Sequence, residues 1–392
     1  MKILVIAPHN YYVDRGTPID LDILLRALSA RGDEVHAAVY DGGEERTYPN
    51  VTVHRPGAPA SLHNLGPGFS LKKLRADRHL FRLARRLVKE LKPDVVHAGE
   101  EAVFMAIHFK FWNKIPYIYD MDSSIAQQMV EKKPVLKPLA GVFNVFEAKA
   151  IRGALACAPV CHALADLAKA RGAKHHETLH DISQLAAPNR APTGFLNEQL
   201  GIPRERPILM YVGNLEAYQG VGLLLEGFAA ARAADDAAPI DLVVAGGTDE
   251  DIADYKQRSE ALGVGDAAHF LGRWPADRLD ELLAEADVLT APRTRGINTP
   301  QKIFPYMHSG RAVLLTRLPT HTQIVDDTVC CLADPTPEAF AAAINALAAD
   351  PQRSRQLGAA GRGFVEAEHI FSAHQRRVNR LYDHVQQQIE TP

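Results

Sequence analysis

Apolar residues gather along the chain in short continuous runs, and segments with helical spacing separate these runs. Residues 2–8 form the first run, which ends in a proline and is typical of a buried parallel strand. Apolar residues then recur at helical spacing over 19–28, Gly32 ends the helix, and 34–40 form a second strand. This order predicts an α/β domain whose first loop lies at the carboxyl edge of a parallel sheet.

The alternation of strands and helices continues through the first half of the chain, and a second series begins at residue 207. Residues 186–206 separate the two series; they are rich in proline and charge and show little periodicity, which is typical of a linker. We therefore predict the following parts: a first domain over 1–190, a linker over 191–206, a second domain over 207–371 and a terminal helix over 372–392.

Residues 70–92 are predicted to form one long amphipathic helix, because leucines and other apolar residues recur near helical spacing. The opposite face is strongly basic, and the acidic residues of this segment are Asp77 and Glu90. Such a face is either simply solvated, or it is a surface for anionic lipid head groups or a phosphorylated acceptor. The basic residues are Lys72, Lys73, Arg75, Arg78, Arg82, Arg85, Arg86, Lys89 and Lys92.

The overall composition excludes several classes of protein. The chain has 392 residues, of which 46% are hydrophobic and 23% charged, as in ordinary globular proteins. A net charge of −3 gives no indication of nucleic-acid binding. The four cysteines show no CxxC spacing, so they predict neither a disulfide framework nor a zinc site and fit a reducing cytoplasm. No apolar stretch reaches the length of a spanning helix, and residues 3–7 are too short for a signal sequence.

Two aspartates, Asp120 and Asp122, follow the strand that we predict at 116–120. Two carboxylates at this spacing are able to hold a divalent ion through a diphosphate. Alternatively, Asp122 is a polar group that faces a ligand, or it caps the next helix. We favour the ligand-facing role and predict no metal site.

The stretch 291–316 carries several cations, among them Arg293, Arg295 and Lys302, and no acid. Thr299 is a suitable N-cap and is followed by a proline, so a helix is predicted to begin there. A helix start with nearby cations favours phosphate binding, although an ordinary basic helix start has the same pattern. Pro305 lies five residues into this helix, and we predict a kinked or broken first turn because proline removes a hydrogen bond.

An ordered set of motifs carries a resemblance to a known family. In the second half these motifs are YVGNLEAYQGVGLLLEGF, LVVAGG, FLGRWPADRLDELLAEADVLTAPR and KIFPYMHSGRAVLLT; in the first half they are GTPIDLDILLRALSARGDEV, PDVVHA and IPYIYDMDSS. The chain resembles the retaining glycosyltransferases of family 4. The resemblance implies the GT-B fold, with two Rossmann-like domains that face a central cleft. It also implies that the terminal helix, with Val378, Leu381, Tyr382 and Val385 on one face, crosses back to the first domain.

The chain departs from that family at several polar positions. The Arg and Lys that usually bind the donor diphosphate correspond to Asn214 and Gln219, and the usual pair of glutamates corresponds to Ile297 and Pro305. The family histidine corresponds to Asp122. Either a divergent branch rebuilt its donor site from the cations of 291–316, or the protein is a degenerate scaffold or regulatory partner. A nucleotide-sugar epimerase on the same fold is a third interpretation.

We favour the rebuilt site, and the resemblance then implies a retaining hexosyltransferase. It would move a sugar from a UDP- or GDP-sugar to an acceptor, with no cofactor and no metal. Asp122, Arg293 and Lys302 are the predicted catalytic residues. The acceptor would be lipid-linked or anionic, which fits glycan or glycolipid biosynthesis in the cytoplasm, with peripheral contact of 70–92 at an anionic inner membrane face. The predicted donor-binding positions are Gly16, Thr17, Gly213, Asn214, Gln219, Trp274, Arg295, Asn298, Thr299 and Gln301.

Overall fold

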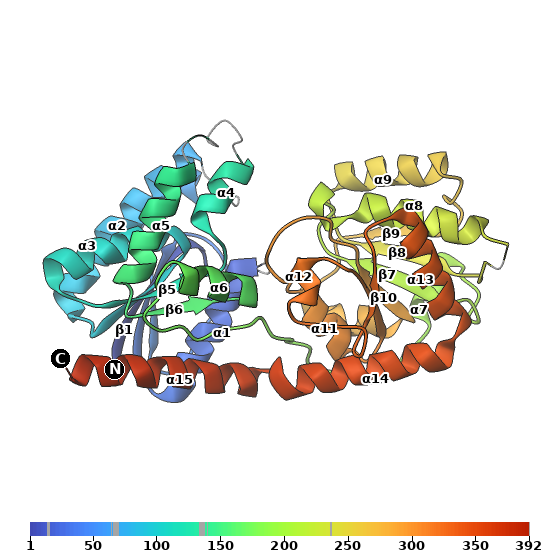
Figure 1. Ribbon diagram of the computed structural model, residues 1–392. Coiled ribbons are helices and arrows are strands. Elements are labelled where there is room, and N and C mark those ends of the chain that lie inside the picture. Colours follow the sequence, from blue (N-terminus) through green and yellow to red (C-terminus); the bar gives the residue numbers. More distant parts are fainter. Residues whose placement is uncertain are drawn as a thin grey trace. The chain divides into compact units, whose positions relative to one another are not determined.

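The structure, a computed structural model, describes residues 1–13, 16–63, 65, 70–132, 138, 140–235 and 237–391. These residues belong to two units, and each is an α/β domain (Figure 1). Unit 1 consists of Met1–Asp181 and Ser372–Pro392, and unit 2 consists of Ile182–Phe371.

Unit 1 is built on one parallel sheet. Strand β1 lies between β2 and β4, so apolar residues on both of its faces are covered, which agrees with its continuous apolar run. In the described part of the chain the spatial order is β3 (Val51–His54), β2 (Glu34–Tyr40), β1 (Lys2–Asn10), β4 (Val95–Gly99), β5 (Tyr117–Met121) and β6 (Ala156–Pro159).

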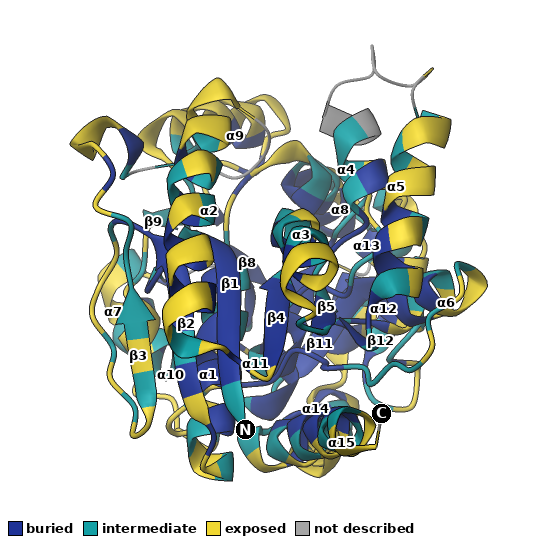
Figure 2. Ribbon diagram, turned by 90° about the vertical axis from the view of Figure 1, so that its left-hand side faces the viewer, coloured by how far each residue is buried: buried dark blue, intermediate teal, exposed yellow. Residues whose placement is uncertain are grey.

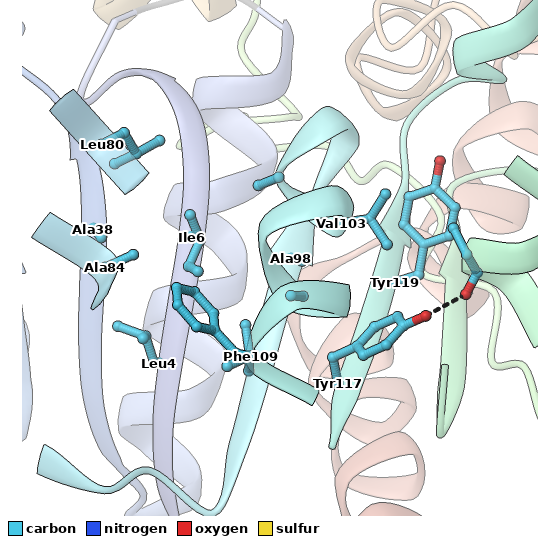
Figure 3. Packing of buried hydrophobic residues seen from close by; sticks show 14 of the residues in the cluster. Leu4, Ile6, Ala38, Leu80, Ala84, Ala98, Val103, Phe109, Tyr117 and Tyr119 are labelled. Carbon is cyan, nitrogen blue, oxygen red and sulfur yellow. Dashed lines mark hydrogen bonds between the residues drawn. The ribbon is translucent and has the colours of Figure 1, made fainter. Parts of the chain in front are cut away.

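Helices cover both faces of this sheet. On one face α2, α3 and α5 pack against the strands, and Leu80, Phe109 and Ile151 contribute to the core there (Figure 3). Ser70 caps α2 by accepting from the Lys73 N–H, and the helix that the spacing predicted over 70–92 is confirmed. The helices of unit 1 are α1 (Gly16–Arg31), α2 (Leu71–Leu91), α3 (Val103–Asn113), α4 (Ile125–Lys132), α5 (Ala140–Gly153), α6 (His162–Ala170) and α15 (Phe371–Glu390).

The terminal helix α15 packs on unit 1, as the resemblance implied. Its predicted apolar face is buried, since Val378, Leu381, Tyr382 and Val385 are all 0% exposed. The side-chain amide of Gln375 donates to the carbonyl of Ala27 on α1 at 2.8 Å. The Tyr382 hydroxyl also lies 2.9 Å from Nδ1 of His97 on β4, so the helix reaches the middle of the sheet.

Unit 2 repeats this architecture. Its central strands β10 and β7 are parallel neighbours, and their inward residues are buried between helices on both faces. Among the residues described, the spatial order of the strands is β12 (Cys331–Ala333), β11 (Ala312–Thr316), β10 (Val288–Ala291), β7 (Ile208–Val212), β8 (Asp241–Ala245) and β9 (Ala268–Gly272).

The helices of unit 2 form two layers. Phe228 of α8 and Phe340 of α13 belong to the core on one face, and Leu282 of α10 and Phe304 of α11 belong to the core on the other. Figure 2 shows the general pattern, with buried strands and helices exposed on their outer sides. The helices are α7 (Phe195–Leu200), α8 (Val221–Ala233), α9 (Asp249–Ala261), α10 (Leu279–Ala284), α11 (Ile303–His308), α12 (Pro319–Thr322), α13 (Pro337–Ala349) and α14 (Pro351–Glu368).

The chain passes from one unit to the other between Asp181 and Ile182, earlier than the predicted boundary at residue 190. The segment predicted as a linker, 191–206, contains α7, and its Leu196 and Ile202 are buried in a core of unit 2. Prolines and charges concealed these apolar anchors, because a six-residue helix is too short to show a periodic pattern.

Two local predictions are wrong. Gly16 and Thr17 precede the helical spacing of 19–28 and so belong to the predicted first loop, but in the structure they begin α1. Thr299 does not cap a helix, because α11 begins only at Ile303. The predicted break in the first turn is confirmed, because the N–H groups of Ile303 and Phe304 donate to carbonyls three residues earlier rather than four. Pro305 lies in the first turn of α11, where a helix needs no N–H donor from it.

Candidate active site

Loops from three parallel strands of unit 2 meet at the carboxyl edge of its sheet, around the ammonium group of Lys302. Lys302 Nζ donates to the hydroxyl of Tyr211 at 2.8 Å and lies 4.0 Å from the centre of that ring. The Tyr211 hydroxyl in turn donates to the carbonyl of Asn214 at 2.5 Å. Gly213, in the loop after β7, has a φ of +151°, which other residues rarely adopt, and a Cβ there would overlap Nζ, so this loop passes close to the lysine.

The charge of Lys302 is poorly compensated. Among the described residues no carboxylate forms an ion pair with it, and its hydrogen-bond partner is a neutral hydroxyl. Burial, followed by the positive charge of Arg293, lowers the pKa of Lys302 to about 7. A partly buried cation of this kind favours an anionic ligand, because the ligand would supply the missing negative charge.

Arg293 lies in the loop after β10, and one hydrogen bond holds its backbone while another holds its side chain. The Thr316 hydroxyl at the end of β11 donates to the Arg293 carbonyl at 2.6 Å, and Arg293 Nε donates to the carbonyl of Arg295 at 2.8 Å. The guanidinium carbon lies 5.2 Å from the centre of the Tyr218 ring. Arg293 and Lys302 therefore come from different positions on one loop but belong to the same cationic cluster.

The loops after β7 and β10 are also joined to each other. The Thr294 N–H donates to the carbonyl of Tyr218 at 2.9 Å. Gly220 has a φ of +80°, and a Cβ there would overlap the carbonyl oxygen of Pro292. This glycine is required by the close contact, and it keeps the two loops together.

His321 on α12 completes this edge of the sheet, and no sequence pattern indicated it. Its Nδ1 lies 2.8 Å from the carbonyl oxygen of Thr316, so Nδ1 donates and Nε2 is left as an acceptor. Burial, together with the charges of Arg293 and Lys302, lowers the pKa of His321 to about 4. Within the described chain, Nε2 of His321 and the hydroxyls of Thr299 and Thr320 are buried without a hydrogen-bond partner. Such groups in one region indicate a place where a ligand or water completes the hydrogen bonds.

The other predicted donor-binding residues of unit 2 divide into two groups. Those in the loops just described, which share the same edge, are Asn214, Gln219, Arg295, Asn298 and Gln301; Gln219 is 8% exposed. Trp274 is held elsewhere: its Nε1 donates to the carbonyl of Arg278 at 2.9 Å, and its ring stacks on Phe195 with centroids 5.8 Å apart. The structure thus assigns Trp274 a packing contact with the linker helix.

Unit 1 has a second cluster of functional side chains, and it is acidic. Asp122 and Asp120 at the end of β5 line a cavity of about 20 Å³ together with Asp20, Asp181 and His374. Burial raises the pKa of Asp122, and the charge of Asp120 raises it further. Burial and the neighbouring Asp181 likewise raise the pKa of Asp20. Thr17 lines an adjoining cavity with Asp20 and Asp122.

Asp120 is positioned by a buried chain of hydrogen bonds. His97 Nε2 lies 3.1 Å from Asp120 Oδ2, and Nδ1 of the same ring lies 2.9 Å from the Tyr382 hydroxyl. Burial lowers the pKa of His374 to about 4, and its Nε2 has no partner among the residues described. The cavity is therefore lined by carboxyl and imidazole groups, which suit the hydroxyl groups of a ligand.

The structure resolves the alternatives for the two aspartates in part. The helix α4 is capped by Ser124, whose hydroxyl accepts from the Gln127 N–H at 3.4 Å, so Asp122 is not the cap. In the described part of the chain no group of three or more His, Cys, Asp or Glu side chains is placed to hold a metal ion. Asp122 lines a cavity, and its ligand-facing role stays a prediction.

Two family models match the sequence. Residues 21–179 match the glycosyl transferase 4-like domain, and residues 206–350 match glycosyl transferases group 1. These matches fall on unit 1 and unit 2 and support a GT-B glycosyltransferase. No curated protein is significantly similar in sequence.

Solved structures confirm the fold. Sucrose-phosphate synthase from Thermosynechococcus elongatus has a TM-score of 0.78 at 17% identity, covering 97% of this chain and 98% of that chain. HepE from Anabaena, in complex with UDP and glucose, has a TM-score of 0.74 at 16% identity, covering 98% and 99%. WaaG, a glycosyltransferase involved in lipopolysaccharide biosynthesis, has a TM-score of 0.67 at 15% identity, covering 96% and 99%.

Proposed function

We propose that this protein transfers a hexosyl group from a UDP- or GDP-sugar to an acceptor with retention of anomeric configuration. One observation carries the proposal: the partly buried Lys302 ammonium lies beside Arg293 at the carboxyl edge of the sheet, without a carboxylate partner among the described residues. This edge is where α/β folds bind nucleotides. Two of the structural neighbours were solved with UDP and glucose and with UDP-glucose, which supports a nucleotide-sugar donor.

In the proposed reaction, Lys302 and Arg293 bind the donor diphosphate and stabilise its negative charge as the bond from the sugar to the phosphate oxygen breaks. The acceptor oxygen forms the new bond on the same face of the sugar, and its proton passes to the leaving phosphate oxygen. Asp122 accepts a hydrogen bond from a sugar hydroxyl. The two cations provide the charge that a metal would otherwise provide, so the reaction is expected to tolerate chelators.

The proposal places the reaction in the cytoplasm. Among the described residues the cysteines form no disulfide, which fits a reducing compartment; they are Cys157, Cys161, Cys330 and Cys331. Among the described residues, every helix is too short or too polar to cross a bilayer.

Donor binding tests the assignment of the cationic site. Calorimetry with a panel of UDP- and GDP-sugars should find at least one donor for the wild type, and Lys302→Met and Arg293→Ala should each weaken it by roughly 10- to 100-fold. Lys256→Met, an exposed lysine on α9, is the matched control. Equal binding by all variants would refute the site, whereas a wild type that binds no donor would support a scaffold role.

Product analysis tests the reaction itself. NMR of the product should show the anomeric configuration of the donor, and an inverted product would exclude retention. Incubation of donor without acceptor should leave its sugar unchanged, whereas conversion under these conditions would indicate an epimerase.

A further inference from the structure

Large apolar side chains are exposed on the three helices α2, α3 and α5, which lie side by side on one face of unit 1. Monomeric globular proteins rarely expose many such residues close together, and a contiguous patch indicates a binding surface. The exposed residues are Leu71 (75%), Leu74 (47%), Phe104 (41%), Phe111 (66%), Trp112 (68%), Val142 (49%), Val145 (52%) and Phe146 (53%).

Contacts between the helices place most of these residues at a similar height along the three helix axes. The ion pair Lys73–Glu101 joins α2 to the short 3-10 turn that leads into α3. Eight residues further along both segments, the stacked rings of Phe81 and Phe109, with centroids 5.7 Å apart, join α2 to α3. Lys110 Nζ donates to the carbonyl of Gly153 at 2.6 Å and joins α3 to α5. Each helix precedes a parallel strand, so all three run in the same direction and their first turns lie together.

The apolar residues near the three helix starts therefore lie at a similar height along α2, α3 and α5, and we call them the apolar band. Leu71 and Leu74 supply the band from α2, Phe104 supplies it from α3, and the α5 residues include Phe146. At the other end of α3, Phe111 and Trp112 pack edge to face with centroids 5.0 Å apart. Both ends of α3 thus present aromatic rings to solvent.

A cation lies beside an exposed aromatic ring both in the band and at the other end of α3, and two acids near the band are engaged. Lys149 Nζ lies 6.0 Å from the centre of the Phe146 ring, and Lys114 Nζ lies 5.7 Å from that of Phe111. Glu101 is paired with Lys73, and the Asp77 carboxylate accepts a hydrogen bond from Tyr40. Further exposed cations on α2 are Lys72, Arg75, Arg78, Arg82, Arg85, Arg86 and Lys89.

We propose that this three-helix face, made of the exposed apolar residues and cations just named, binds the surface of a membrane that contains anionic lipids. Aliphatic and aromatic side chains enter the boundary between head groups and acyl chains, while lysines and arginines attract the anionic head groups. An exposed tryptophan is favoured at that boundary. The basic face of α2 alone would serve any polyanion, but the apolar band gives no advantage with a nucleic acid or a free phosphate.

Vesicle co-sedimentation tests the proposal without donor or acceptor, so its outcome is independent of the proposed transferase activity. The full chain should bind vesicles of phosphatidylcholine and phosphatidylglycerol more tightly than vesicles of phosphatidylcholine alone, and high salt should weaken the binding. Arg75→Gln with Arg78→Gln should weaken it roughly 25-fold, at about a factor of five for each cation near the surface. Equal sedimentation with both kinds of vesicle would overturn the proposal.

The apolar band is tested separately. Phe104→Ser with Phe146→Ser should reduce vesicle binding, whereas Leu262→Ser, at the 40% exposed leucine of unit 2, should leave it unchanged. The chain has two tryptophans, so Trp274→Phe leaves Trp112 as the reporter, and its fluorescence should shift to the blue on anionic vesicles. Serine variants that bind as the wild type does, or a Trp112 signal that does not move, would show that this face does not enter the lipid boundary.

Discussion

Replacing Lys302 with methionine should make the protein more stable and its donor binding weaker. The side chain keeps its length but loses its charge, which burial and Arg293 make unfavourable in the folded state. A pKa that falls from 10.5 to about 7 corresponds to roughly 5 kcal/mol as an upper limit. Lys302 stays partly exposed to solvent, which reduces this to roughly 2–3 kcal/mol.

Two favourable contacts are lost in the same substitution. The hydrogen bond to the Tyr211 hydroxyl and the position of Nζ over its ring together contribute about 1–2 kcal/mol. The expected net gain for Lys302→Met is therefore about 1 kcal/mol. The gain should also depend on pH: below pH 7 both states of the wild type are protonated and the cost of the charge is complete, and it disappears as pH rises toward 10.5.

Chemical denaturation at pH 6.5 and at pH 9.5, with Lys256→Met as the exposed control, measures this dependence. The variant should exceed the wild type in stability at the lower pH, and the two should converge at the higher pH. Donor affinity should depend on pH with the opposite sign to stability. The wild type should lose affinity above pH 7 as Lys302 loses its proton, whereas the affinity of the variant should not change with pH. A variant that is less stable at pH 6.5, or a gain that does not change with pH, would refute the reasoning.

Three further predictions concern other parts of the structure. Gly220→Ala should destabilise unit 2 by roughly 2–4 kcal/mol, because its Cβ would overlap the Pro292 carbonyl at a φ of +80°; denaturation within 1 kcal/mol of the wild type would contradict this. Asp122→Asn should stabilise the protein increasingly as pH rises above the ordinary carboxyl range, since burial raises the pKa of Asp122 and its protonated form is favoured when folded; melting curves that keep a constant offset across pH would exclude it. Tyr382→Phe should cost about 1 kcal/mol through the hydrogen bond to His97, and an unchanged unfolding midpoint in urea would argue against that bond.

Much of the fold was predictable because it depends on local periodicity. The apolar run of β1, the spacing along α2 and the apolar face of α15 each follow from burial on one face or on both. The boundary between the units was not predictable from composition. Leu196 and Ile202 anchor the supposed linker in a core of unit 2, and two isolated apolar residues produce no period.

Of the candidate site, only the charged residues could be predicted from the sequence. The cations Arg293 and Lys302 stand out because the surrounding stretch has no acid, and the glycines indicate loops. Tyr211 and His321, in contrast, belong to runs that read as ordinary strand and helix. Their roles arise because parallel strands distant in sequence end at one edge of a sheet, and this placement is fixed by tertiary structure.

The two charged clusters share a property that structural packing alone does not require. In unit 2 a cation is held where burial and a like charge oppose it, and in unit 1 the carboxyls of Asp20 and Asp122 are held where burial and neighbouring acids oppose their ionisation. Both arrangements destabilise the folded protein, and replacement by neutral side chains would remove the cost. Both also lie at the carboxyl ends of parallel strands, where this fold presents its loops. A ligand at each cluster would offset its cost, an anion at the cations of unit 2 and a hydroxyl-bearing group at the carboxyls of unit 1, and this makes each cluster a candidate binding site.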